Sequence, residues 1–390
     1  MNILLYDMSS FTQSDLIYYL RQAGHKCKNV LYKFKDIYND EYFCRYFTAC
    51  LHNAQFDCVI STNFFPLVAK VCYENNIKYL AWSYDSPVAK HHLEYYDYPT
   101  NYIFLFDKEE VAYFHNIGLA RFYHLPLAVN LKRLRSIAIS PKDVQNYSCD
   151  ISFIGQFYKS PLKDLLLFQD DYTKGYIHAI VDAQSKVYGY NFVSELVQQE
   201  LIEHMNNNFL EKNLNIHETN GGTLSRDGLI HSINKQITRM ERIVLLQLLS
   251  RYYQVHIYSS EQIDLLNQAT YCGTADYLTE MPKVFRLSKI NINPTLRSIH
   301  SGIPLRALDI IGCGGFLLSN YQPELAEYFQ PDVDVIMYES IEDALYKADY
   351  YLAHEEERKK ILQNALTILE EHFTYPIRIT TMLQVAGLIE

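Results

Sequence analysis

The sequence predicts an α/β protein made of two doubly wound domains, each with a parallel sheet. Short apolar runs rich in β-branched and aromatic residues recur along the 390 residues, and few of them alternate polar with apolar positions. Such runs are typical of strands that are buried on both faces. Segments with helical periodicity separate them, and this alternation places a ligand edge at the carboxyl ends of the strands.

The first five strand candidates define an N-terminal domain over residues 1–140. They lie at 2–6, 57–62, 77–82, 102–106 and 122–128. The segment between the first two predicts a helix with Ser14 or Asp15 as its N-cap and Gly24 as its stop. A strand followed by such a helix is the repeating unit of a doubly wound domain.

A polar stretch at 140–148 is expected to be a linker to a second domain over residues 149–372. The strand candidates of this domain lie at 151–155, 253–259, 289–294, 315–319 and 333–338. Residues 162–249 show helical periodicity with polar breaks at 204–208 and 218–223, which predicts a helical insertion. Pro376 interrupts the last helical pattern, and residues 373–390 are expected to return to the N-terminal domain as a final helix.

Composition limits the classes of partner. The formal net charge is -10 with a pI of about 5.8, which argues against a broad nucleic-acid or anionic-membrane surface. The sequence shows no signal-peptide pattern and no apolar run of about 18 residues, so we expect a cytoplasmic protein without a transmembrane segment. The eight cysteines form no metal-binding spacing and are interpreted as reduced, mostly buried thiols.

A local anion site is expected despite this charge. Residues 281–308 contain five basic residues and no acidic one, namely Lys283, Arg286, Lys289, Arg297 and Arg306. A helix is expected to begin just after Pro304 and to end at Gly314 and Gly315, so free backbone N–H groups and the helix dipole add to the positive patch. Arg306 is expected to bind a diphosphate, and Asp309, one turn later, to accept hydrogen bonds from ribose hydroxyls. This pairing indicates a nucleotide sugar or a dinucleotide.

The stretch 271–338 resembles the donor-binding half of GT-B glycosyltransferases, and within them the spore-protein CgeB-like group. The resemblance rests on Arg306, Asp309, the Gly314-Gly315 pair and the strand sequence "FLLSN". The broader family carries a second acidic residue eight positions before the ribose-binding one, and this chain has Ser301 there. The rest of the chain resembles the family more loosely.

The resemblance implies two Rossmann-like domains facing a cleft, with a nucleotide sugar, expected to be UDP-linked, on the second and a protein, polysaccharide or glycan acceptor on the first. It implies a donor site made of Gly155, Gly273, Tyr277, Arg297, His300, Ser301, Gly302, Arg306 and Asp309. Three of these have alternative interpretations from the residues alone: Arg297 as a solvated loop charge, His300 as a capping or packing residue, and Gly155 as a turn glycine.

The resemblance also implies catalysis without a metal or other cofactor, because basic side chains and a helix N-terminus can serve the diphosphate. The candidates for the general base are Asp7 and Asp85, both at strand ends of the first domain. Asp85 has an alternative interpretation as the cap of an Asx turn. Two other functions stay open: a GT-B-like sugar-nucleotide epimerase, and a non-catalytic carbohydrate-binding or cell-surface assembly protein, which the serine at position 301 favours.

Overall fold

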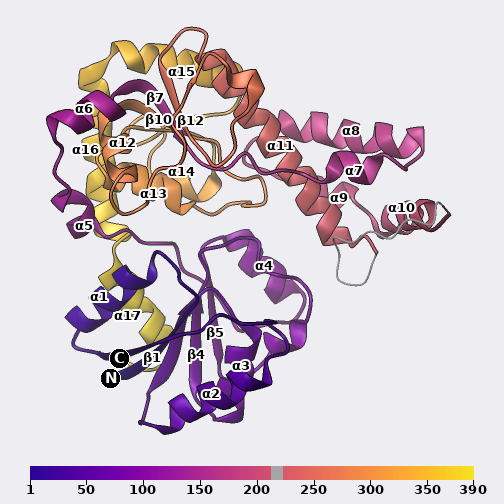
Figure 1. Ribbon diagram of the computed structural model, residues 1–390, viewed down its shortest axis with the longest axis vertical. Helices are drawn as coiled ribbons and strands as arrows, with labels where there is room; N and C mark the ends of the chain where they lie inside the picture. Colours follow the sequence, from indigo (N-terminus) through magenta and orange to yellow (C-terminus); the bar gives the residue numbers. More distant parts are fainter. Residues whose placement is uncertain (212–222) are drawn as a thin grey trace. The chain divides into compact units, whose positions relative to one another are not determined.

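The structure is a computed structural model that describes residues 1–211 and 223–390. Two compact units make up the chain. Unit 1 comprises Met1–Arg135, Gly302–Gly312 and Thr367–Glu390, and unit 2 comprises Ser136–Ser301 and Cys313–Leu366. Each unit contains one parallel sheet of six strands with helices around it (Figure 1).

The sheet of unit 1 has the strand order β2-β1-β3-β4-β5-β6, and every neighbouring pair is parallel. Its strands are β1 (Asn2–Asp7), β2 (Lys26–Leu31), β3 (Cys58–Thr62), β4 (Lys78–Trp82), β5 (Asn101–Leu105) and β6 (Phe122–His124). The sequence predicted all of them except β2. That strand lies at the sheet edge with most residues exposed, so it carries polar side chains in place of a buried apolar run.

The helices of unit 1 are α1 (Gln13–Gln22), α2 (Glu41–His52), α3 (Pro66–Glu74), α4 (Lys108–Asn116), α5 (Leu131–Ser136), α13 (Leu305–Gly312) and α17 (Tyr375–Val385), with the 3-10 turn η1 (Leu93–Tyr95). The predicted N-cap of α1 was wrong, because the helix begins after Thr12. Asp15 is buried in the first turn, where it binds Arg133 and Asn130. Gly24 follows the helix with a φ of +83°, a conformation that suits glycine.

The final helix, α17, lies beside α1 in unit 1 (Figure 1). The rings of Tyr19 and Tyr375 stack with centroids 5.3 Å apart. Pro376 occupies the first turn of α17, a position where its missing N–H has no helical partner to lose. The preceding helix, α16 (Glu355–His372), runs from unit 2 into unit 1.

The sheet of unit 2 has the order β12-β11-β10-β7-β8-β9, again with parallel neighbours. Its strands are β7 (Cys149–Ile154), β8 (Val255–Tyr258), β9 (Thr270–Tyr271), β10 (Ser288–Asn293), β11 (Leu317–Asn320) and β12 (Ile336–Tyr338). Sequence patterns predicted five of these and missed β9, which has only two residues. The stretch at 140–148, expected to be a linker, is helical over most of its length: Ser140 and Asp143 make a capping box at the start of α6 (Pro141–Tyr147).

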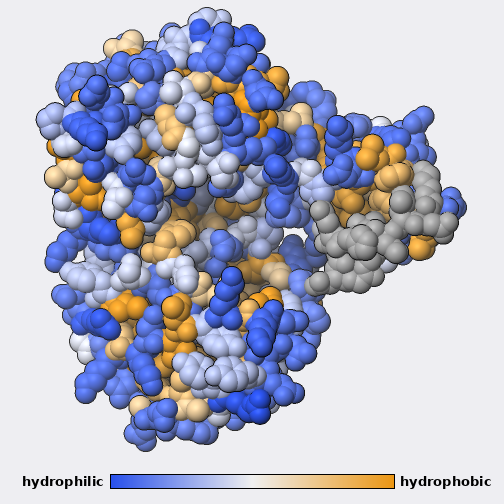
Figure 2. All heavy atoms as spheres, in the orientation of Figure 1, coloured by the Kyte–Doolittle hydropathy of each residue, from blue (hydrophilic) through white to orange (hydrophobic). Residues whose placement is uncertain are grey.

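Between residues 162 and 249 the described part of the chain contains helices and no strand. These are α7 (Leu162–Leu166), α8 (Asp171–Ser185), α9 (Val193–Leu196), α10 (Gln199–Glu211) and α11 (Arg226–Leu249). The predicted break at 204–208 was wrong, because these residues continue α10; the other, at 218–223, lies outside the described residues except for Thr223. Helices α7 to α10 extend away from the sheet together with the first half of α11 (Figure 1). Figure 2 shows some apolar surface in this region, where Leu167 is 57% and Leu210 is 66% exposed.

Helix α11 connects two cores of unit 2. Its residues Ile233 and Ile237 pack with helices α7 to α10, whereas Leu245 and Leu249 pack with the sheet. The remaining helices of the unit are α12 (Met281–Leu287), α14 (Pro323–Tyr328), α15 (Ile341–Ala353) and the 3-10 turn η2 (Asp264–Leu266). No helix in the described ranges has the length and apolar character needed to span a bilayer. The eight cysteines are all free thiols, five of them buried.

Candidate active site

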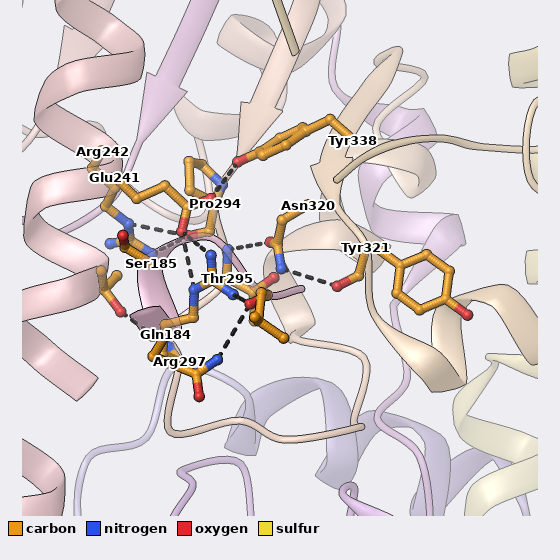
Figure 3. Close-up of polar contacts among 12 residues, drawn as sticks. Gln184, Ser185, Glu241, Arg242, Pro294, Thr295, Arg297, Asn320, Tyr321 and Tyr338 are labelled. Carbon is orange, nitrogen blue, oxygen red and sulfur yellow. Dashed lines mark hydrogen bonds and ion pairs between the residues drawn. The ribbon is translucent and has the colours of Figure 1, made fainter. Parts of the chain in front are cut away.

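A buried ion pair organises the carboxyl edge of the second sheet (Figure 3). The guanidinium of Arg297 donates from Nε to Glu241 Oε2 over 3.1 Å and from Nη1 to the carbonyl oxygen of Val187 over 2.9 Å. The hydroxyl of Tyr338, at the end of β12, donates to the other carboxylate oxygen of Glu241 over 3.0 Å. Burial alone would lower the pKa of Arg297, but the Glu241 carboxylate outweighs it and raises that pKa.

This pair decides between the two interpretations of Arg297. The side chain is only 7% exposed and its guanidinium lies 4.2 Å from the ring centroid of Tyr188, so it is not a solvated loop charge. Two of its nitrogens already bond to Glu241 and Val187. Arg297 therefore fixes the loop that follows β10, and any effect on a ligand passes through that loop.

Arg242, the next residue on α11, joins two further strand ends (Figure 3). Its guanidinium donates to the carbonyl oxygens of Pro294, after β10, and of Gln156, after β7. The cation lies over the ring of Tyr158 at 4.8 Å, and its burial lowers its pKa. Gly155 makes room here, because a Cβ atom on it would lie 2.9 Å from the Phe153 ring and 3.6 Å from Arg242 Nη1. This supports the interpretation of Gly155 as a structural turn glycine, because a side chain there would clash beside the buried Arg242.

The ends of β10 and β11 are also bonded to each other. Asn320 accepts from the backbone N–H of Thr295 over 2.6 Å (Figure 3), and Asn293 donates to Ser319 Oγ over 3.1 Å. Both strand ends are therefore held by buried polar side chains. In a doubly wound sheet this is the edge at which ligands bind.

Ser301 stands where the broader family has an acidic residue, and its hydroxyl bonds to a carboxylate from elsewhere in the chain. Its hydroxyl donates to Glu324 Oε1 over 2.7 Å, and the Glu324 N–H donates to the Ser301 carbonyl over 3.0 Å. Both side chains are buried, and Glu324 stands in the first turn of α14. A buried acid therefore does lie beside position 301, supplied by another element.

The other donor-site candidates of unit 2 lie on loops. His300 is half-buried, as is Tyr277. Gly273 follows β9 with a φ of +78°, and its carbonyl accepts from the Ser259 N–H over 2.6 Å. A left-handed glycine that closes a loop is consistent with either a structural role or a binding role.

The candidates in the segment Gly302–Gly312, which contains α13, group with unit 1. Gly302 approaches the chain after β5 so closely that a Cβ atom on it would lie 2.7 Å from the Phe106 carbonyl oxygen. Arg306 is half-buried, and Asp309 is buried at 2% exposure. Burial is the main cause that raises the pKa of Tyr84, and the charge of Asp309 adds to it. Tyr84 lies in the loop after β4.

Asp85 lies in that same loop, exposed and held by one neighbour. Asn63 donates to its carboxylate over 2.7 Å and accepts from the backbone N–H groups of Tyr84 and Asp85. Asn63 itself adopts a φ of +69° after β3. In the described contacts of Asp85, its carboxylate accepts from no backbone N–H of its own loop, so the Asx-turn interpretation does not apply to it.

Asp7 caps a turn of its own loop, the role that was the alternative interpretation of Asp85. Its Oδ1 accepts from the N–H groups of Ser9 and Ser10 over 2.7 and 3.1 Å, and its Oδ2 from Asn29 over 3.3 Å. This is an Asx-type turn. Of the two base candidates, Asp85 keeps more of its carboxylate available.

Metal ligands are not grouped in the parts of the chain that are described. No three side chains of His, Cys, Asp and Glu gather there as a metal site. The one D-x-D triplet of the sequence, residues 332–334, lies in the turn before β12, where Asp334 accepts from the Gln330 N–H. It therefore lies at the amino end of its strand, away from the edge described above.

Comparison with known proteins agrees with this architecture. Residues 239–384 match a family model described as "Glycosyl transferase-like". A glycosyltransferase from Rickettsia africae has 10% identity and a TM-score of 0.60, with 99% of this chain and 97% of that chain covered. Sucrose-phosphate synthase from Thermosynechococcus elongatus has 10% identity and a TM-score of 0.56, with 99% and 98% covered. HepE from Anabaena, solved with UDP and glucose, has 9% identity and a TM-score of 0.52, with both chains fully covered. No curated protein sequence matches the chain.

The chain has the GT-B fold.

Within this GT-B fold, sequence analysis missed Glu241, Arg242, Glu324 and Asn63. Glu241 and Arg242 belong to a segment that was interpreted as an insertion, although two adjacent opposite charges between apolar helical turns were a visible signal. Asn63 follows a buried strand directly, which is the position where polar residues of such sheets gather. Glu324 carried no signal of its own, because its contact with Ser301 joins residues 23 positions apart.

Proposed function

We propose that this protein is a glycosyltransferase that moves a sugar from a UDP-linked donor to a protein, polysaccharide or glycan acceptor without a metal or other cofactor. The proposal includes a hexosyltransferase type, a role in bacterial glycan synthesis, the cytoplasm as its location, and membership of the CgeB-like group. The observation that carries it is the glycosyltransferase match over residues 239–384, because that range contains Glu241, Arg242, the carboxyl ends of strands β8 to β12, and α13.

Two further observations support the choice of donor. HepE, whose fold the chain shares, was solved in complex with UDP and glucose. Arg306 and Asp309 stand one turn apart at the start of α13, a spacing that suits a diphosphate and a ribose respectively. We propose that the backbone N–H groups of Ser301 and Gly302 add to the diphosphate site. Gly155 and His300 are proposed as further donor-binding residues, from unit 2.

The remaining residues receive positioning or acceptor roles. Gly273 and Tyr277 would border the nucleobase. Arg297 would act by fixing the loop after β10, since its donors bond to Glu241 and Val187. Asp85 would be the general base that accepts the proton of the acceptor hydroxyl, and Asp7 the weaker candidate because of its turn bonds.

The test is release of UDP from a panel of UDP-sugars, with and without candidate acceptors, in the presence and absence of EDTA. The proposal expects acceptor-dependent UDP release that EDTA leaves unchanged. Activity abolished by EDTA and restored by manganese would contradict the metal-free mechanism. Conversion of one UDP-sugar into another without an acceptor would instead indicate an epimerase, and no turnover of any UDP-, GDP- or dTDP-sugar would indicate a non-catalytic protein.

The serine at position 301 was the sequence feature in favour of a non-catalytic protein. The contact with Glu324 weakens that argument, because a buried carboxylate stands 2.7 Å from the Ser301 hydroxyl. No other observation on this structure favours the two alternatives.

A further inference from the structure

Glu110 is a buried carboxylate for which the proposed reaction has given no role. It stands in the first turn of α4, after β5, and is 9% exposed. Carboxylates are rarely buried unless they are paired or strongly hydrogen-bonded. A buried acid near the carboxyl ends of β4 and β5 therefore needs an explanation.

Both hydrogen bonds of Glu110 go to the loop that carries Asp85. Ser86 donates from its hydroxyl to Oε2 over 2.9 Å, and the backbone N–H of Val88 donates to Oε1 over 2.6 Å. These two donors lie one and three residues after Asp85. On the other side of Asp85, Asn63 holds the backbone of Tyr84 and Asp85. The aspartate is thus held from both sides, by an amide before it and by a carboxylate after it.

The charges that face Glu110 come from its own helix and from this loop. Asp107 caps α4 and accepts from the Glu110 N–H over 3.2 Å, so a second negative charge lies close by. Lys90, further along the loop, has the opposite effect. Burial is the main cause that raises the pKa of Tyr96, and the charges of Tyr38 and Glu110 add to it. Burial first, and Asp107 second, raise the pKa of Glu110 to about 7, against the pull of Val88, Ser86 and Lys90.

We propose that Glu110 is the positioning residue for Asp85, and that its ionised form is the one that holds the Asp85 loop in place. Ser86 and Val88 both donate to Glu110, and the ionised carboxylate accepts both bonds most strongly because neither of its oxygens carries a proton. Protonation turns one oxygen into a hydroxyl, which is a poorer acceptor. The loop, and with it Asp85, is then held less firmly.

The inference rests on the proposed function for its catalytic part only. The loop can be observed without any substrate, because the sole tryptophan of the sequence, Trp82, ends β4 directly before it. Its ring lies 5.0 Å from that of Tyr84. Tryptophan fluorescence therefore reports on the surroundings of Trp82, which include Tyr84 of this loop, Tyr375 of α17 and the Leu125 carbonyl that accepts from its indole N–H. The comparison with Glu110→Gln separates the contribution of the loop.

The experiment is a fluorescence titration of the full-length protein between pH 5.5 and pH 8.5. The wild type should show a transition centred at about pH 7, and Glu110→Gln should remove it and keep the spectrum of the low-pH form. Glu74→Gln, an exposed glutamate that faces Lys70, is the matched control and should keep the transition. Ser86→Ala removes one donor and should move the midpoint upward by roughly half to one pH unit. It also serves if Glu110→Gln fails to fold.

Activity supplies the second readout. The kcat of the wild type should rise roughly tenfold through pH 7, and Glu110→Gln should stay at the low value without that rise and with KM for the donor unchanged. A wild-type transition that survives in Glu110→Gln, or a midpoint unmoved by Ser86→Ala, would overturn the inference. A Glu110-dependent transition in a protein that turns over no nucleotide sugar would leave the contact with the loop standing and contradict the proposed function.

Discussion

A single buried residue pair, Arg297 and Glu241, holds the loop after β10. Removing the arginine leaves a carboxylate with 3% side-chain exposure without its cation, and an uncompensated buried charge costs about 3 to 5 kcal/mol. We expect Arg297→Ala to lower the free energy of unfolding by that amount in urea titrations. Lys186→Ala removes one member of an exposed pair with Asp182 and should change it by less than about 1 kcal/mol. Equal effects of the two substitutions would show that the buried pair adds nothing specific.

Substitutions of Arg306 and Asp309 test the proposed binding of UDP at the level of single residues. A charge-assisted contact with phosphate is worth about 1.5 to 3 kcal/mol, so Arg306→Ala should weaken UDP binding roughly ten- to a hundred-fold in calorimetry. Lysine should restore part of the affinity, since an ammonium cannot make the planar two-point contact. Asp309→Asn should lose less affinity than Asp309→Ala. Two folded alanine variants with unchanged affinity for UDP would place the nucleotide site elsewhere.

Single residues were the hardest scale to predict from the sequence. Arg297 stands in a basic stretch and was assigned to the ligand, but its partner Glu241 lies 56 residues earlier on α11. Likewise Ser301 was interpreted as a lost acid, whereas Glu324 supplies one from α14. Both pairs join distant elements. Local pattern shows which residue types occur at a strand end, but not which of them face each other there.

Among the elements, the segment Gly302–Gly312 begins at a glycine that has no room for a side chain. A Cβ atom at Gly302 would lie 2.7 Å from the Phe106 carbonyl and 3.0 Å from Asp107 Cα, both of them backbone atoms. We expect Gly302→Ala to lower the free energy of unfolding by about 1 to 3 kcal/mol through overpacking. Gly175→Ala is the control, because nothing lies within 4 Å of a Cβ atom at that position in α8. It should be neutral or should stabilise by up to about 1 kcal/mol.

Elements with a buried apolar run were predicted well, and those without one were missed. Strands β1, β3, β4 and β5 carry runs that are almost entirely buried, and their existence followed from the sequence. Strand β2 is missing from the prediction because it forms a polar sheet edge. Helix α6 was interpreted as a linker because its residues are polar, while its capping box, which a scan for Ser followed three residues later by an acid would find, was overlooked.

For the molecule as a whole, Glu110 adds a dependence of stability on pH. Its pKa is higher in the folded protein, at about 7, than the ordinary value of 4.5. The folded state therefore binds more protons between these pH values, so the stabilising contribution is complete below pH 4.5 and is lost as the pH rises through 7. The change amounts to about 3 kcal/mol. Unfolding free energies of the wild type minus those of Glu110→Gln should fall by that order from pH 4.5 to pH 8, and a constant difference would contradict the elevated pKa.

The path of the chain between the two units limits how this protein can be divided. The backbone passes from one unit to the other after residues 135, 301, 312 and 366. A fragment that ends at residue 135 would lack α13 and α17, and would leave Tyr19 without the ring of Tyr375 that stacks on it. No contiguous piece of the sequence contains one unit alone: unit 1 is spread over the whole chain, and the range 136–366, which holds all of unit 2, also carries Gly302–Gly312 of unit 1. We therefore expect truncated chains, and chimaeras that exchange one unit at a single junction, to be insoluble. Chimaeras that exchange the three segments of unit 1 together should stay soluble, because both units are then complete.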